Sequence, residues 1–368
     1  MRVWVVSHAY VAAVNQDKLR ALARLPDLDL TLLAPAAWRT AFGLMPLPPP
    51  PTPYRVVASR VLGSGRIGAH VYRGGMRELW RARPDIVHAE LEPWSLAALQ
   101  CVLAARRARI VVFTWENLEG PRRLLSRAIE RVVLRRAAFV IAGSQQARAR
   151  LLRRGVPVAR TRVLPQFGVD PERYAREGGP EPIAGLAPPV VGYVGRLVPE
   201  KGVDLLVDAL APLDARLLVV GDGPARAELE RRVAGWPPGK AVFAGGVDHA
   251  AVPAWLRGLD ALVLPSRTTA AWAEQFGHVL IEAMAAGVPV VGSSSGAIPE
   301  VIGDAGLMFP EGDAAALGRQ LAWLLGDPAV RAMLARRGRE RVRAGYTHEA
   351  IAAAQHEIYR ELLSPPTV

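Results

Sequence analysis

The chain has 368 residues, of which 51% are hydrophobic, so it is long enough to bury two cores. Its net charge of +12 is unevenly divided, because residues 1–180 carry 29 basic and 13 acidic side chains, whereas residues 181–368 carry 17 and 21. The basic half favours an anionic partner, such as a membrane surface or a phosphorylated acceptor, although an arginine-rich solvated surface explains it as well. No zinc-ligand cluster, aromatic RNA-binding signature or basic zipper accompanies this charge, which argues against nucleic acid.

The N-terminal apolar run is interrupted at Ser7 and His8, so we expect a buried strand there rather than a signal sequence. The sequence has no apolar stretch long enough to cross a bilayer. Its single cysteine, Cys101, lies in an apolar segment and has no partner for an internal disulfide. These features predict a cytoplasmic protein, with peripheral contact at the inner face of the membrane as an option.

Short β-branched segments alternate with helical patterns in the first half of the chain. The expected strands are residues 2–7, 28–35, 85–90, 109–116 and 139–144. The expected helices between them are residues 17–25, 76–83, 96–106 and 122–137. Such alternation predicts an α/β fold with a parallel sheet covered by helices on both faces.

Clustered proline and glycine at residues 165–190 indicate a linker between two domains. We expect a first domain at residues 1–175 and a second at residues 188–345. The second repeats the alternation, with strands expected at residues 190–196, 215–223, 241–246, 261–266 and 289–294. The amphipathic segment 348–363 predicts a last helix, which could pack back on the first domain.

Two glycine-flanked cations follow the first strand of the second domain, in the segment GRLVPEKG at residues 195–202. Gly195 and Gly202 allow backbone to approach a ligand, while Arg196 and Lys201 can reach the carboxyl end of the sheet. Two cations at one crevice predict an anionic ligand, although ordinary surface charges would account for this short motif about as well.

A pair of glutamates eight residues apart marks the segment 265–291. Glu274 precedes a predicted helix that begins near Gly277, and Glu282 lies inside that helix among apolar residues, where a charge requires a partner. The helix N-terminus offers free N–H groups to a phosphate, and carboxylates suit sugar hydroxyls. Glu274 taken alone is weaker evidence, because glutamates are common in loops.

Together with GDGP at 221–224, LPS at 264–266 and SSSGAIPEVI at 293–302, these motifs resemble the family 4 retaining glycosyltransferases of the GT-B fold. The resemblance covers nearly the whole chain and is strongest at residues 190–310. It implies two Rossmann-like, doubly wound parallel-sheet domains facing across a cleft. It also implies transfer of a hexose from a nucleoside diphosphate sugar, such as a UDP-sugar, to a hydroxyl of a glycan, a lipid-linked or a small-molecule acceptor.

The resemblance assigns roles to individual residues. It implies that Arg196 and Lys201 hold the donor diphosphate, that Glu274 faces the donor sugar and that Glu282 binds the ribose. Backbone near Val247 would contact the base, and the Phe276–Gly277 turn would lie at the phosphates. No cofactor and no metal are expected, because two cations and a helix N-terminus can neutralise a departing diphosphate.

The first half departs from the family where the acceptor should approach. The usual glycine-rich loop is replaced by SHAYVAAVNQDK at residues 7–18, and a common histidine is absent where TWENLEG stands at residues 114–120. Strand ends beside the expected crevice supply the acceptor-side candidates, and Trp115 among them could stack on a sugar ring. These candidates are His8, Asn15, Trp115, Glu116 and Asn117.

The basic helical segment 121–136 is the main indication of the acceptor class, since leucines and arginines together suit an anionic membrane. An ordinary basic surface helix fits it equally well. Other functions also remain open at this stage: a GT-B epimerase or phosphorylase would need the same nucleotide or phosphate grip, and a non-catalytic nucleotide-sugar binding protein would tolerate the altered first-domain loops.

Overall fold

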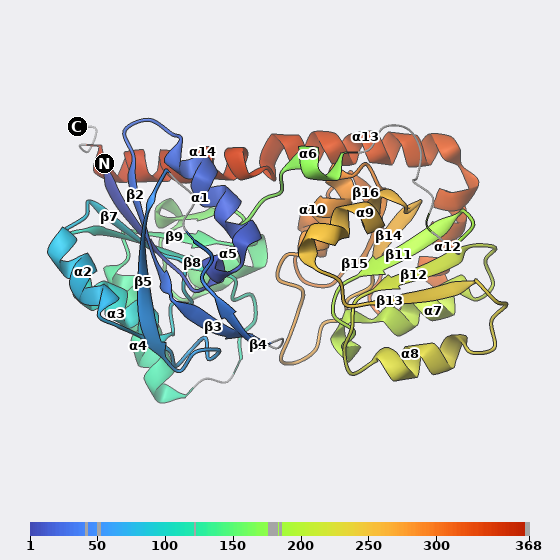
Figure 1. Ribbon diagram of the computed structural model, residues 1–368, viewed down its shortest axis with the longest axis horizontal. Coiled ribbons are helices and arrows are strands. Elements are labelled where there is room, and N and C mark those ends of the chain that lie inside the picture. Colours follow the sequence, from blue (N-terminus) through green and yellow to red (C-terminus); the bar gives the residue numbers. More distant parts are fainter. Residues whose placement is uncertain (41–42, 50–52, 121–122, 176–182, 184–185, 365–368) are drawn as a thin grey trace. The chain divides into compact units, whose positions relative to one another are not determined.

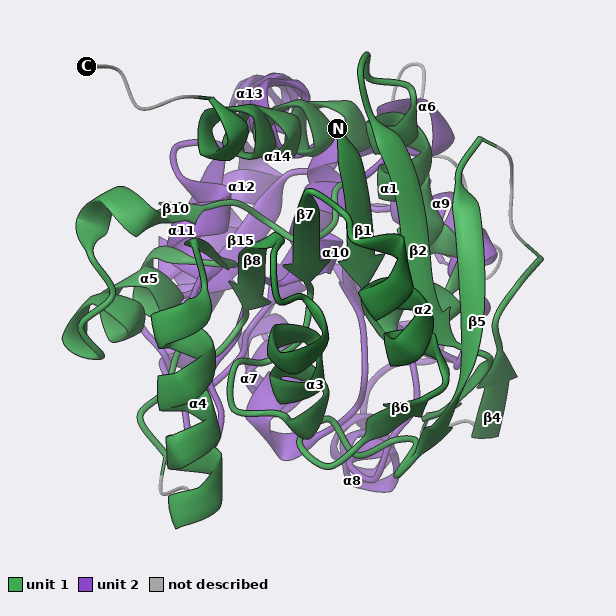
Figure 2. Ribbon diagram, turned by 90° about the vertical axis from the view of Figure 1, so that its left-hand side faces the viewer, with its two compact units in different colours: residues 1–168, 348–368 green, residues 169–347 purple. Residues whose placement is uncertain are grey.

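The computed structural model describes residues 1–40, 43–49, 53–120, 123–175, 183 and 186–364. The chain forms two compact units (Figures 1 and 2). Unit 1 consists of residues 1–168 and 348–368, and unit 2 of residues 169–347. Within the described residues, no helix is both long and apolar enough to span a membrane.

Unit 1 is built on an eight-stranded sheet with the order β10-β9-β8-β7-β1-β2-β5-β6, in which all pairs except β5–β6 are parallel. A separate two-stranded antiparallel ribbon is formed by β3 and β4. The strands are β1 Arg2–Val6, β2 Asp29–Pro35, β3 Ala37–Thr40, β4 Gly43–Pro46, β5 Arg55–Leu62, β6 Val71–Arg73, β7 Ile86–Ala89, β8 Arg109–Thr114, β9 Phe139–Ala142 and β10 Thr161–Val163.

Helices cover both faces of this sheet, and each face has its own hydrophobic core. Leu79, Cys101 and Val133 bring α2, α3 and α4 onto one face, and α5 joins them there. Leu22 and Ile358 bring α1 and the last helix, α14, onto the other face, so the amphipathic C-terminal segment belongs to unit 1. The helices of this unit are α1 Gln16–Ala23, α2 Gly75–Ala82, α3 Leu96–Ala104, α4 Leu124–Arg136, α5 Gln145–Arg153 and α14 His348–Leu363.

Unit 2 contains a six-stranded, wholly parallel sheet with the order β13-β12-β11-β14-β15-β16. Its strands are β11 Val190–Val194, β12 Arg216–Val220, β13 Ala241–Gly245, β14 Ala261–Leu264, β15 Val290–Ser293 and β16 Gly306–Phe309. Its helices are α6 Pro171–Tyr174, α7 Val203–Leu210, α8 Arg226–Val233, α9 Val252–Arg257, α10 His278–Ala285, α11 Ile298–Ile302, α12 Ala314–Gly326 and α13 Pro328–Gly345.

The strand order of unit 2 is that of a doubly wound dinucleotide-binding sheet, whose direction of winding reverses between β11 and β14. Loops leaving the carboxyl ends of two such neighbouring strands diverge, and ligands bind in the space between them. The same reversal occurs in unit 1 between β1 and β7. Each unit therefore has one edge at which a ligand site is expected.

The division between the units falls after residue 168, seven residues before the expected end of the first domain at 175. The short helix α6 explains the difference, because it packs against α9 and α10 of unit 2. The hydroxyl of Tyr174 at its end donates a hydrogen bond to Glu282. The second unit also runs to residue 347 rather than 345, and α14 begins directly after it.

A buried ion pair lies at the winding reversal of unit 1. Lys18 of α1 contacts Glu90, which follows β7, and both side chains are almost fully excluded from solvent. The hydroxyl of Tyr10 and the amide of Gln166 donate further hydrogen bonds to Glu90, of 2.7 and 2.9 Å. Burial opposes the charge on Glu90, but Lys18, His88 and Gln166 hold the pKa of this carboxyl below its usual value.

Removing one partner of this pair should be far more damaging than removing an exposed ion pair. We expect Lys18→Ala to lower the free energy of unfolding by about 3–5 kcal/mol, since Glu90 would remain buried and uncompensated. Arg55→Ala is the matched control, because Arg55 and Glu78 form an exposed pair worth at most about 1 kcal/mol. Equilibrium urea unfolding measures both, and equal losses would contradict the expectation.

Candidate active site

The loops that follow β11 and β14 meet at the winding reversal of unit 2 (Figure 1). Gly202 lies in the left-handed region, with a φ of 64°, and a methyl group added to it would stand 2.1 Å from the carbonyl oxygen of Pro265. Only glycine allows the two backbones to come this close. The glycine after Lys201 therefore fixes the distance between the two loops.

Lys201 and Glu274 form an ion pair across these loops. The Lys201 Nζ lies 2.6 Å from Oε2 of Glu274, and their side chains are 15% and 8% exposed. The hydroxyl of Ser266 donates to the same oxygen at 2.8 Å. The Lys201 ammonium also lies 4.9 Å from the centre of the Trp272 ring, a cation–π distance. The cation and the first glutamate expected from the sequence are thus in direct contact.

The backbone of Glu274 is held by a second glycine turn. Gly296 has a φ of 54°, and a methyl group on it would lie 2.0 Å from the Glu274 carbonyl oxygen. The N–H of Ala297 donates to that oxygen at 2.9 Å. The segment after β15, which contains the SSSG motif, therefore positions the backbone of Glu274.

Arg196 is exposed, and its side chain makes no ion pair with any residue that the structure describes. Its carbonyl oxygen accepts a 2.7 Å hydrogen bond from the buried hydroxyl of Tyr193. Burial and the nearby charge of Glu274 raise the pKa of Tyr193, while Arg196 opposes that rise. Gly195 leaves room for this hydroxyl, since a methyl group there would be 2.9 Å from it.

Glu282 forms the centre of a second cluster in unit 2. Its Oε1 accepts hydrogen bonds from the Tyr174 hydroxyl at 3.0 Å, from His249 Nε2 at 2.9 Å and from His278 Nδ1 at 3.2 Å. Burial opposes its charge, but the two histidines outweigh this and hold the pKa of Glu282 below its usual range. Glu282 is therefore ionised at neutral pH, and all three donors use one oxygen.

His249 brings the loop after β13 to this glutamate. Val247, whose backbone is expected to contact the nucleobase, lies two positions before His249 and is half-buried. Because His249 contacts Glu282, the loop that carries Val247 is tied to the glutamate expected to bind the ribose. The two residues assigned to the nucleoside are thus connected in the structure.

Helix α10 begins between the two glutamates. Its N-cap is Gly277, with a φ of 77°, and no side chain caps the first turn. A methyl group on Gly277 would lie 2.7 Å from Leu264, so glycine is required for packing as well as for backbone conformation. Phe276 is buried beside His278 and Tyr346. A helix start whose N-cap residue has no side chain suits a phosphate.

The acceptor-side candidates lie in unit 1. His8 follows β1, and its ring packs against Trp38 and His70 at centroid distances of 4.6 and 5.5 Å. Burial, with a smaller contribution from His70, lowers the pKa of His8 to about 4, so its ring is neutral at pH 7. The Nδ2 of Asn15 donates to the Ala9 carbonyl at 2.8 Å, which holds together the two short 3-10 turns that replace the glycine-rich loop.

Trp115 is fixed in place by several contacts. Its indole N–H donates to Gln166 at 2.8 Å, and its backbone N–H to Glu92 at 3.0 Å. Its ring packs so closely on Gly143 that a methyl group there would stand 2.1 Å away. Glu116 is half-buried, and Asn117 is 8% exposed. Trp115 therefore has a packing role, and sugar stacking by it stays a prediction.

Several residues of the Lys201–Glu274 cluster and of the Glu282 cluster are not expected from the sequence. Tyr193, Ser266 and Trp272 support the first cluster, and Tyr174 and His249 the second. His278 could have been found, because it lies one helical turn before Glu282. Ser266 ends the LPS motif, and Tyr193 and Trp272 lie close to GRLVPEKG and Glu274, but these patterns do not indicate their contacts. Tyr174 and His249 approach from distant segments with no motif of their own. Among the residues that the structure describes, no group of three or more potential metal ligands comes together.

Comparison with known proteins places both halves of the chain in glycosyltransferase families. Residues 188–327 match the family described as glycosyl transferases group 1, and residues 11–166 match the glycosyl transferase 4-like domain. The 2-deoxystreptamine glucosyltransferase of Streptomyces kanamyceticus is 30% identical over 295 residues, which cover 72% of this chain and 74% of that protein. The 2-deoxystreptamine N-acetyl-D-glucosaminyltransferase of Streptomyces fradiae is 32% identical over 319 residues, 76% of this chain and 73% of that protein.

The fold has close structural counterparts. Sucrose-phosphate synthase from Thermosynechococcus elongatus superposes with a TM-score of 0.70 at 25% identity, over 98% of this chain and 99% of that one. Anabaena HepE in complex with UDP gives a TM-score of 0.74 at 18% identity, over the same shares. With two doubly wound units and these relatives, the chain belongs to the glycosyl transferases group 1 family and is a glycosyltransferase of the GT-B fold.

Proposed function

We propose that the enzyme transfers a hexose from a nucleoside diphosphate sugar to an acceptor hydroxyl with retention of anomeric configuration. The observation that carries this proposal is the Lys201–Glu274 pair beside Arg196, at the winding reversal of the unit 2 sheet. A buried lysine, an unpaired arginine and an uncapped helix start suit a diphosphate. A carboxylate in contact with the lysine suits the hydroxyls of the attached sugar.

In the proposed reaction, the bond between the anomeric carbon and the diphosphate breaks while a bond to the acceptor oxygen forms on the same face of the sugar. The acceptor proton passes to a phosphate oxygen of the leaving group. Arg196 and Lys201 stabilise the charge that develops on the diphosphate, which is the kind of contribution that dominates many active sites. This charge balance requires no metal, and Glu274 orients the sugar.

Glu282 and Val247 complete the donor site in this proposal. The ionised carboxylate of Glu282 has one oxygen engaged by Tyr174, His249 and His278, and its other oxygen would accept from ribose hydroxyls. The backbone at Val247 would contact the base. UDP is the candidate nucleotide, because HepE binds it in a structure of the same fold.

Loss of either cation should reduce turnover strongly. We expect Arg196→Ala and Lys201→Ala each to lower kcat/KM by about 10²–10³-fold, as for other single electrostatic contacts in active sites. Lys240→Ala is the control, because Lys240 is a half-buried lysine of the same unit that lies outside both clusters. Release of nucleoside diphosphate measures the rates, and melting temperatures check folding. Unchanged turnover in Arg196→Ala, whose side chain has no described ion pair to lose, would refute the assignment.

The turn at Gly296 offers a test that leaves every charged side chain in place. We expect Gly296→Ala to displace the Glu274 backbone and to lower kcat/KM for the donor at least tenfold, because the added methyl group would overlap the Glu274 carbonyl. Gly235→Ala is the matched control, since nothing lies within 4 Å of a methyl group there. Steady-state kinetics with varied donor decides, and equal behaviour of the two variants would contradict the positioning role.

The acceptor is proposed to bind at the carboxyl edge of the unit 1 sheet, at the segments that hold His8, Asn15, Glu116 and Asn117. Its class is suggested by helix α4. Leu124 and Leu125 at its start are 83% and 67% exposed, and Val132 is 47% exposed. Exposed arginines lie between them, at positions 123, 127, 131 and 135. Residues 121–122 of this segment lie outside the described part of the chain. We propose that α4 contacts an anionic membrane that presents a lipid-linked acceptor.

This contact predicts salt-sensitive binding to anionic vesicles. We expect Leu124→Ser/Leu125→Ser to weaken co-sedimentation with phosphatidylglycerol vesicles at least tenfold. A leucine that passes from water into the membrane contributes about 1.5–3 kcal/mol to binding when it is fully removed from water. Leu62→Ser/Val158→Ser is the control, since both residues are exposed but lie on other elements of unit 1. Equal binding of the two double variants would exclude α4 as the membrane-binding element. If the unaltered protein does not bind the vesicles, the proposed membrane contact is excluded.

A further inference from the structure

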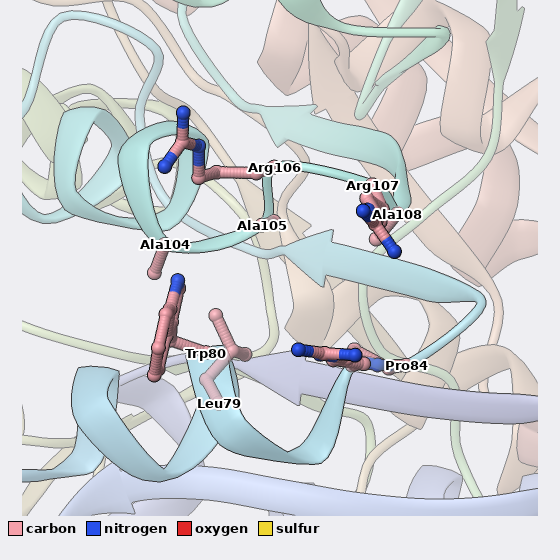
Figure 3. A pocket seen from close by; sticks show the side chains of 9 residues that line it. Leu79, Trp80, Pro84, Ala104, Ala105, Arg106, Arg107 and Ala108 are labelled. Atoms are coloured by element: carbon pink, nitrogen blue, oxygen red, sulfur yellow. The ribbon is translucent and has the colours of Figure 1, made fainter.

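A second candidate site lies at the opposite edge of the unit 1 sheet. Residues 83–85 and 105–108 precede β7 and β8, so they lie at the amino ends of these strands, away from the His8 edge. Between them is a pocket of about 430 Å³, lined by Leu79, Trp80, Arg83, Arg106, Arg107 and Ala108, among others. Figure 3 shows Trp80 on one side of this hollow and Arg107 on the opposite side.

The charge of this pocket is one-sided. The side chains of Arg83, Arg106 and Arg107 are exposed, and none of them makes an ion pair or hydrogen bond with another described residue. The segments that bring them here, LWRARP at 79–84 and AARRAR at 104–109, contain no acidic residue. Arginines that line one pocket repel one another unless an anion lies between them, although Figure 3 shows the Arg106 side chain directed away from Arg107.

Helices α2 and α3 both point their C-terminal ends toward the pocket, and the free carbonyl groups of a helix C-terminus carry a partial negative charge. Free carbonyls there would disfavour the binding of an anion. Other arginines occupy those carbonyls. Arg2 donates to the carbonyls of Ala82 and Arg83 at 3.2 and 2.9 Å, and Arg136 to those of Ala105 and Arg106 at 3.2 and 3.1 Å. The nearby carboxylate of Asp85 accepts the N–H of Arg2 at 2.7 Å. The negative groups are thus engaged, while the three lining arginines are not.

The backbone at Arg83 supports a role for its side chain. Arg83 ends α2 in the left-handed region, with a φ of 47°. That position is usually glycine, because a side chain is disfavoured in the left-handed region. Here the strained position carries a guanidinium at the pocket. Trp80, which is 52% exposed, adds an apolar surface beside it.

We infer that this pocket binds a phosphate group, as a phosphomonoester or phosphodiester, outside the transferase site. Guanidinium groups match phosphate oxygens in paired hydrogen bonds, and Trp80 would contact the carbon skeleton attached to the phosphate. The volume accommodates a phosphate with a small organic group. A free metabolite and a lipid head group present the same chemistry, so the test separates them.

Equilibrium dialysis with radiolabelled inorganic phosphate, at constant ionic strength, tests the site. The chain of 368 residues carries Arg196→Ala/Lys201→Ala, so that phosphate at the proposed donor site does not contribute and failure of the donor assignment remains distinguishable. We expect one phosphate per chain, with affinity reduced at least tenfold by Arg83→Gln/Arg107→Gln. The control is Arg24→Gln/Arg77→Gln, which removes equal charge from exposed arginines of unit 1 outside the pocket.

Equal affinity in the two double variants, or no binding by the starting protein, would overturn the inference. Binding of glycerol 3-phosphate and binding to vesicles that contain phosphatidic acid then distinguish a soluble phosphate ester from a lipid head group as the ligand. Loss of vesicle binding in Arg83→Gln/Arg107→Gln, but not in the control, supports the site and assigns it to a lipid head group. Loss of glycerol 3-phosphate binding alone supports the site and assigns it to a soluble phosphate ester.

Discussion

The contact between Gly202 and Pro265 is the constraint on which the proposed donor site depends. It joins the loops after β11 and β14, and it sets the separation at which Lys201 meets Glu274. A side chain at Gly202 would force the loops apart and leave a buried ammonium and a buried carboxylate without each other. Backbone geometry and electrostatics are therefore coupled: the glycine allows the ion pair, and the ion pair stabilises a close approach of two polar loops.

Two separate clusters serve the two ends of the proposed donor. Lys201, Glu274 and Arg196 gather at the winding reversal, while Glu282 is held by Tyr174, His249 and His278. Helix α10 connects them, because it begins at Gly277 between the glutamates and carries the second glutamate inside. The eight residues that separate the two glutamates thus place Glu274 in a loop and Glu282 inside the helix that follows it.

Much of this architecture could be predicted from the sequence. The ten strands expected from β-branched runs are all present within a few residues, because fully buried parallel strands have a strong apolar signature. Six strands, β3, β4, β5, β6, β10 and β16, are not expected from the sequence. Five of them are only three or four residues long, and β5, with eight residues, has only two buried side chains. Lys201 and Glu274 follow β11 and β14, which are neighbours in the sheet, so strand order and loop position were enough to expect them close together.

The acceptor side was less predictable for a physical reason. Candidates such as Trp115 and His8 were chosen because they end strands, but their environments depend on long-range partners. Gln166 and Gly143 fix Trp115, and Trp38 and His70 surround His8, from segments that no local pattern connects. A residue at a strand end can face a ligand or a neighbouring loop, and periodicity does not distinguish these directions.

The position of α14 has a consequence for how the chain acquires its structure during synthesis. Ile351, Ile358 and Tyr359 complete the second core of unit 1, yet they are translated after the whole of unit 2. Residues 1–168 are therefore synthesised long before the helix that covers this face of their sheet. Until then, the apolar surface of β1, β2 and α1 is left for water or chaperones to cover.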